Sequence, residues 1–163
     1  IVRRLVGSEM CIRDSSSMAF GNGGTSVDPT GIITYLTPNS TGTNASLYNQ
    51  TFTKIVDDRS VSNLDPQRNK IETRHVNGTN YTDVVVTCLL DYGEPNGQDA
   101  TDTASASDSL YVFDELGLVS YASSGTGKLL THVIFHPVQK SLNRLIQIDY
   151  TVRVQSLTGF NEG

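Results

Sequence analysis

Two histidines four residues apart, His132 and His136, are the first residues of this chain whose spacing suggests chemistry. On a helix, the pattern H-x-x-x-H places two imidazoles on one face, where they can bind zinc. The surrounding segment THVIFHP is typical of a strand instead, and four residues of strand span roughly 13 Å. One metal ion cannot be shared over that distance. The sequence therefore predicts one histidine on a strand face, one at a strand end, and no metal site.

Two further segments could bind a ligand. The sequence GTGK at 125–128 resembles part of a phosphate loop, but the glycine spacing, the following Ser or Thr and the flanking strand and helix are missing, so a turn is predicted. The polar loop 91–109 carries Asp99, Asp102 and Asp108, whose carboxylates could bind calcium. The loop lacks the D-x-D-x-D-G order of a calcium-binding loop, so no cofactor is predicted, and calcium stays an alternative.

Nucleophilic catalysis needs an activated Ser or Cys beside an oriented base. Cys88 falls within an apolar run, which indicates a small core residue, and the chain contains no G-x-S-x-G sequence. Asp114 and Glu115 are neighbours on a predicted strand, so we expect their side chains to point to opposite faces. The sequence thus predicts no catalytic residues and no enzyme. A small hydrolase that uses one of the three histidines remains an alternative: His75, His132 or His136.

The composition indicates the elements that hold these residues. Thr, Ser, Val, Ile, Tyr, Gly and Asn are abundant, and helix-forming runs of Ala, Glu, Leu and Lys are missing. We expect a mainly β protein: a small antiparallel β-sandwich or open barrel with at most one short helix. No long apolar run predicts a membrane span, and no basic patch predicts binding to nucleic acid.

Several segments show strand patterns. GIITYL at 31–36 is a short candidate, and Asn77-Gly78 between two alternating runs predicts a hairpin over Lys70–Leu90. In its second run, Val84, Val86, Cys88 and Leu90 share one face. Further strands are expected within 110–121, 127–136 and 143–155, and HPVQKSLNR could hold one helical turn. The last strand alternates most regularly, with these residues on one face: Ile146, Ile148, Tyr150, Val152 and Val154.

The first 17 residues show no sustained strand or helix pattern. Residues 4–14 include LVGSEMCIRD, which resembles the translation of a transposase-type adapter used to prepare DNA for sequencing. We therefore interpret 1–17 as a translated adapter scar rather than native sequence, with Met18 as the native start. A native basic arm is the alternative. Residues 18–30 are expected to form a flexible Gly/Asn/Ser-rich arm, 31–156 a single β domain, and 157–163 a tail, with truncation at Gly163 as an alternative.

Excluding residues 1–17 changes the chemistry of the chain. Cys88 becomes the only cysteine, so no disulfide can form within one chain. Of the 12 basic and 17 acidic residues, 9 and 15 remain, because five are removed, and the net charge becomes −6; the five are Arg3, Arg4, Arg13, Glu9 and Asp14.

The sequence YVFDELGLVS at 111–120, followed by GKLLTHVIFHPVQKSLNRLIQIDYTVRV at 127–154, resembles virion structural proteins of tailed, T-even-like marine phages. The resemblance covers tail, baseplate and fibre-attachment proteins and carries no catalytic residues. It implies an assembly or attachment module of the virion, put together in the host cytoplasm, which contacts other tail or baseplate proteins and forms a homo-oligomer. A carbohydrate-binding β-sandwich that recognises a host surface is the alternative, although the chain has no Trp to stack on sugars.

Overall fold

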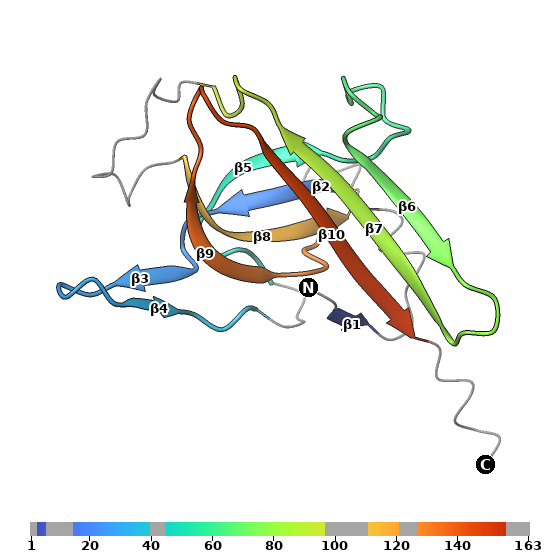
Figure 1. The fold of residues 1–163 in the computed structure, drawn as a ribbon, viewed down its shortest axis with the longest axis horizontal. Coiled ribbons are helices and arrows are strands. Elements are labelled where there is room, and N and C mark those ends of the chain that lie inside the picture. The colour runs from blue at the N-terminus through green and yellow to red at the C-terminus, as the bar shows by residue number, and fades with distance from the viewer. Residues whose placement is uncertain (1–2, 6–14, 40–44, 97–110, 121–126, 156–163) are drawn as a thin grey trace, which may run out of the picture.

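The computed structural model describes residues 3–5, 15–39, 45–96, 111–120 and 127–155 (Figure 1), with side-chain surroundings from Ser17 onward. These residues form ten strands and no helix. The prediction of a mainly β fold is confirmed. None of the described segments is a helix long and apolar enough to cross a membrane.

Two four-stranded sheets make up the body. The first has the order β1-β10-β7-β6, from Arg3–Leu5, Ile146–Gln155, Tyr81–Leu90 and Lys70–His75. The second has the order β5-β2-β8-β9, from Gln50–Ile55, Ser15–Gly21, Val112–Ser120 and Val133–Gln139. All neighbours are antiparallel except β1, which pairs with β10 in parallel. A separate two-stranded hairpin of β3 (Thr25–Val27) and β4 (Ile33–Tyr35) extends from the body in Figure 1.

The core lies between the two large sheets and is built from alternating residues of both. The predicted inward face of β7 is confirmed, since Val84, Val86, Cys88 and Leu90 are all fully buried. The predicted face of β10 also packs on the core, with Tyr150 and Val152 buried and Ile146, Ile148 and Val154 partly buried. The second sheet contributes the following residues: Met18, Phe20, Phe113, Leu116, Leu118 and Val133.

The predicted Asn77-Gly78 hairpin joins β6 to β7. Their register pairs His75 with Thr82 and continues to Lys70 with Thr87. Gly78 has a φ of +89°, a conformation that favours glycine, and the Thr79 N–H donates to the Val76 carbonyl at 3.2 Å to close the turn. The hairpin prediction is confirmed.

The expectation of a flexible arm at 18–30 is wrong for its first part, and the domain does not begin at residue 31. Met18–Gly21 belongs to β2, which lies between β5 and β8 inside the second sheet. Met18 and Phe20 are separated by one residue and enter the core together. The nearby glycines obscured this short strand pattern, because Gly usually marks a loop.

The expected boundaries of β9 are also wrong. The strand begins at Val133 and continues through His136 and Pro137 to Gln139. Its pairing with β8 shifts register between Phe113 and Glu115. β9 is an edge strand, where a proline without an N–H is tolerated. The following connection contains a turn, closed by Arg144 N–H donating to the Ser141 carbonyl at 3.1 Å, and no helix among its residues.

The adapter interpretation of residues 1–17 stays a prediction. Arg3–Leu5 pairs with Val152–Val154 through the backbone, and Ser15–Gly21 forms β2. Backbone pairing is open to almost any residue, so this contact does not separate a native strand from a translated adapter. Cys11 and the tail 157–163 lie outside the described residues.

Candidate functional site

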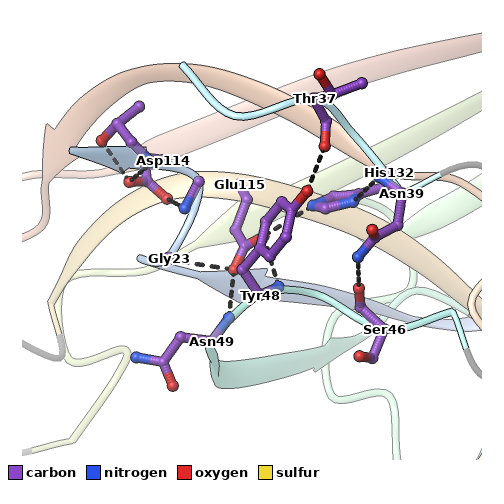
Figure 2. A network of polar contacts seen from close by, with 11 residues as sticks. Gly23, Thr37, Asn39, Ser46, Tyr48, Asn49, Asp114, Glu115 and His132 are labelled. Atoms are coloured by element: carbon purple, nitrogen blue, oxygen red, sulfur yellow. Dashed lines mark hydrogen bonds and ion pairs between the residues drawn. The ribbon is translucent and has the colours of Figure 1, made fainter. Parts of the chain in front are cut away.

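The main polar cluster of the described residues centres on Glu115 in β8 (Figure 2). Its Oε1 accepts hydrogen bonds from Asn49 N–H at 2.8 Å and Gly23 N–H at 3.3 Å. Its Oε2 accepts from Tyr48 N–H at 3.0 Å and lies 2.7 Å from His132 Nε2. The side chains of Glu115 and His132 are both 0% exposed. A buried carboxylate is thus surrounded by four donors.

Asp114 extends this network instead of pointing away from it. Its Oδ1 accepts from Gly24 N–H at 2.9 Å, and its Oδ2 accepts from the N–H and the hydroxyl of Thr25 at 2.9 and 2.6 Å. The prediction that the side chains of Asp114 and Glu115 point to opposite faces is therefore wrong, because both accept hydrogen bonds from the segment Gly23–Thr25. The register irregularity of β8 and β9 at this point interrupts the alternation of side chains.

A strap formed by residues 37–39 and 45–49 crosses the outer face of the second sheet. A Cβ on Gly21 would lie 2.4 Å from the Asn49 carbonyl oxygen, and one on Gly117 would lie 2.3 Å from the Thr131 carbonyl oxygen. Leu47 of the strap is buried. Gly21 has no side chain, so the strap backbone can approach β2 closely enough for Tyr48 and Asn49 to reach Glu115. At Gly117, the missing side chain leaves room for the backbone of Thr131, which precedes His132.

His132 ties the strap to the sheet. Its Nδ1 accepts a hydrogen bond from Asn39 N–H at 2.8 Å, so in the neutral ring the proton is on Nε2, which donates to Glu115. The Tyr48 ring lies 5.5 Å from the imidazole, centroid to centroid, and its hydroxyl donates to the Thr37 carbonyl at 2.5 Å. Both ring nitrogens of His132 are therefore engaged within the fold.

The charge state of Glu115 follows from this cage of donors. Burial raises the pKa of Glu115, but the hydrogen bonds from His132, Asn49 and Tyr48 outweigh burial and hold the pKa below its usual value. Glu115 is therefore ionised at neutral pH, and its charge is balanced by donors rather than by water. We call this cluster of Asp114, Glu115, His132 and the strap the carboxylate clamp.

A carboxylate that orients a histidine is half of a hydrolytic triad, but this pair is not arranged for attack on a substrate. Neither side chain reaches solvent, and the second imidazole nitrogen is used by the strap. The other two histidines lie elsewhere: His75 ends β6 beside the Thr82 hydroxyl, and His136 is exposed on β9. The described geometry gives the clamp a structural role.

A second feature is an apolar groove between β9 and β10. It encloses about 260 Å³ and is lined by Phe20, Phe113, Leu116, Val133, Phe135, Val138, Ile146, Ile148, Asp149 and Tyr150. Asp149 is exposed and borders the groove, but it alternates with Ile148 and Tyr150, so its side chain belongs to the opposite face of β10. A groove of this kind can accept apolar side chains of another molecule.

The remaining predicted residues are placed as follows. Cys88 is fully buried, and burial raises the pKa of its thiol to about 12. Of the polar loop, residues 91–96 are described, and Glu94 forms an ion pair with Lys54 at 2.5 Å. Asp99, Asp102 and Asp108 lie outside the described residues, and within these no cluster of three metal-binding side chains is present. Lys128 of GTGK donates its backbone N–H to the Ser120 hydroxyl.

The carboxylate clamp was not predicted from the sequence, although the sequence contains one indication of it. Asp114 and Glu115 interrupt an otherwise apolar strand, and a charged residue in a buried strand needs a partner. The identity of that partner could not be predicted from the sequence, because His132 and Tyr48 are distant from Glu115 in the chain.

A comparison with family models, curated proteins and solved structures finds no match for this chain.

Proposed function

We propose that this chain is a structural protein of a phage virion, a tail or baseplate module that acts through contacts with other proteins. The observation that carries the proposal is where the resembling segment lies in the fold. Residues 111–154 form β8, β9 and nearly all of β10, and they provide every residue that lines the apolar groove except Phe20. The part of the chain that resembles virion proteins therefore builds the surface best suited to a protein partner.

The edges of the two sheets support the same proposal. β9 is the outer strand of its sheet, and among the described residues β10 pairs on its outer side only with β1, at Val152–Val154. β9 and the first half of β10 therefore lie beside the groove at the outer side of their sheets, as far as the described residues show. An exposed strand edge next to an apolar surface is a common site of protein association.

The carboxylate clamp fits an assembly part. It fixes the strap and the start of β3 to the second sheet through a set of buried hydrogen bonds to Asp114 and Glu115. A partner then meets a pre-formed surface, which lowers the entropy cost of binding. The carbohydrate-binding alternative draws less support, since the groove is lined mostly by apolar side chains, and sugars need several polar partners.

Resequencing the parent DNA with long reads across this locus tests the proposal. We expect the reading frame to lie among genes for tail and baseplate proteins. A frame that lies among cellular metabolic genes would remove the basis of the proposal. The same reads test the adapter interpretation, because they show whether residues 1–17 are encoded in the unfragmented DNA.

A further inference from the structure

Two Asn-Gly steps lie wholly within the described residues, Asn22-Gly23 and Asn77-Gly78, and their surroundings differ. In such a step the backbone nitrogen of the glycine can attack the side-chain carbonyl carbon, Cγ, of the asparagine. Glycine allows this attack most readily, because it has no side chain to hinder the approach and its backbone adopts the most conformations. An Asn-Gly step is therefore a place where an asparagine can become an acidic residue without an enzyme.

Asn77-Gly78 lies at the tip of the β6–β7 hairpin and is open to solvent. Both residues are exposed, and a Cβ on Gly78 would meet no other atom within 4 Å. The turn is closed by its flanking residues, through the Thr79 N–H and the Val76 carbonyl. Within the described part of the chain, neither the Asn77 side chain nor the Gly78 N–H forms a hydrogen bond. Both reacting groups are thus available to each other.

Asn22-Gly23 follows β2 and is held by the strap and the carboxylate clamp (Figure 2). The Gly23 N–H donates to Glu115 Oε1 at 3.3 Å. The Asn22 N–H donates to the Asn49 carbonyl at 3.1 Å, and the Asn22 side-chain oxygen accepts from Asn49 Nδ2. A Cβ on Gly23 would lie 2.8 Å from the Asn49 nitrogen, so the backbone has little room to rotate here. Both reacting groups are therefore engaged with other parts of the fold.

The charge of Glu115 opposes the reaction at Gly23 directly. A glycine nitrogen attacks only after it has lost its proton, which leaves a negative charge on that nitrogen. An ionised carboxylate that accepts this N–H favours the protonated form and repels the new charge. No such carboxylate binds the Gly78 N–H among the described residues. The two steps have the same sequence, so the fold alone sets the difference in their reactivity.

We propose that Asn77 is a site of spontaneous deamidation, and that the carboxylate clamp protects Asn22 from the same reaction. The Gly78 nitrogen loses its proton to hydroxide and forms a bond to Cγ of Asn77. The bond from Cγ to Nδ2 then breaks, and the leaving nitrogen takes up a proton from water and departs as ammonia. Water opens the resulting succinimide at either carbonyl. The products are aspartate and isoaspartate, and each adds one negative charge to the turn.

Mass spectrometry of the full chain during incubation at mildly alkaline pH tests the proposal. Peptide fragmentation locates each replacement of an amide by a carboxylate, and it distinguishes aspartate from isoaspartate. In folded protein we expect Asn77 to react at least about tenfold faster than Asn22, because reaction at Asn22 requires that several hydrogen bonds open first. In denaturing urea the two rates should be similar, since the fold no longer separates the two steps.

Glu115→Gln tests whether the clamp causes the protection. This variant removes the negative charge opposite the Gly23 N–H, so the rate at Asn22 should rise several-fold while the rate at Asn77 stays the same. Glu72→Gln on β6 is the matched control and should change neither rate, because Glu72 contacts neither step. Circular dichroism establishes that each variant is folded during the incubation. The comparison of folded and unfolded wild type stands without either variant.

Equal rates at Asn22 and Asn77 in the folded wild type, or no reaction at Asn77, would overturn the proposal. An unchanged rate at Asn22 in folded Glu115→Gln would also overturn the role assigned to the clamp. None of these results depends on the proposed virion function, which the sequencing experiment tests separately.

Discussion

Replacing Glu115 by Gln probes the carboxylate clamp with a change of nearly constant shape. Each carboxylate oxygen faces two donors: Asn49 and Gly23 on one side, Tyr48 and His132 on the other. In Gln, one of these oxygens becomes an NH₂ group, so at least one buried N–H then meets another donor. His132 cannot resolve this by moving its proton to Nδ1, because that nitrogen accepts from Asn39 N–H.

The expected loss of stability follows from these contacts. One buried donor left without a partner costs about 1–3 kcal/mol, and the hydrogen bonds to the ionised carboxylate are lost as well. We expect Glu115→Gln to lower the free energy of unfolding by about 3 kcal/mol, which corresponds to a decrease in Tm of roughly 6–12 °C for a chain of this size. Urea unfolding followed by circular dichroism measures the change.

The difference between wild type and variant should also depend on pH. The pKa of Glu115 is lowered from 4.5 in the folded protein, so its contribution is fully present above the unfolded pKa and is lost as pH falls through the lower folded pKa. The wild type should thus lose its advantage over Glu115→Gln below about pH 4.5. Glu72→Gln on β6 is the control: ion pairs with Lys70 and Arg74 also lower the pKa of Glu72, but these pairs are exposed to solvent, so the change should be much smaller than for Glu115→Gln. A Glu115→Gln protein with unchanged stability, or a difference that is constant across pH, would refute the role assigned to the clamp.

Three further results are expected. Gly117→Ala should cost about 1–3 kcal/mol in urea unfolding, because its Cβ would lie 2.3 Å from the Thr131 carbonyl oxygen, whereas Gly93→Ala has open space and should be neutral; equal effects would contradict the close approach of Thr131 to β8. Cys88, with its pKa raised to about 12, should resist alkylation in native protein at pH 8 and react after unfolding, as peptide mass spectrometry would show; rapid native labelling would contradict its burial. Deletion of residues 1–14 should leave Tm unchanged in thermal unfolding, and a loss of several degrees would show that the pairing of β1 with β10 stabilises the fold.

The regular strands could be predicted because each has a local signal. The alternation in β7 and β10 indicated which side chains enter the core, and Asn77-Gly78 located the turn between β6 and β7. These signals depend only on neighbouring residues. The prediction failed at β2, where two core side chains, Met18 and Phe20, stand next to glycines, and at β9, where Pro137 is accepted because the strand is at an edge.

The clamp and the groove could not be predicted in the same way. Glu115 and His132 are 17 residues apart, and Asn49 is 66 residues from Glu115, so their meeting depends on the order of strands in the sheet. The alternation of side chains along a strand also gave a wrong prediction for Asp114 and Glu115. The register shift between β8 and β9 interrupts this alternation, so both carboxylates bind the segment Gly23–Thr25.

Mass spectrometry of virus particles tests the central claim most directly. Particles from the sample that yielded the DNA would be purified on a density gradient, digested with trypsin and searched for the β10 peptide LIQIDYTVR, Leu145–Arg153. A virion structural protein predicts that this peptide is enriched in the particle fraction together with tail and baseplate peptides. Its presence only in the cellular fraction would contradict the assignment to the virion.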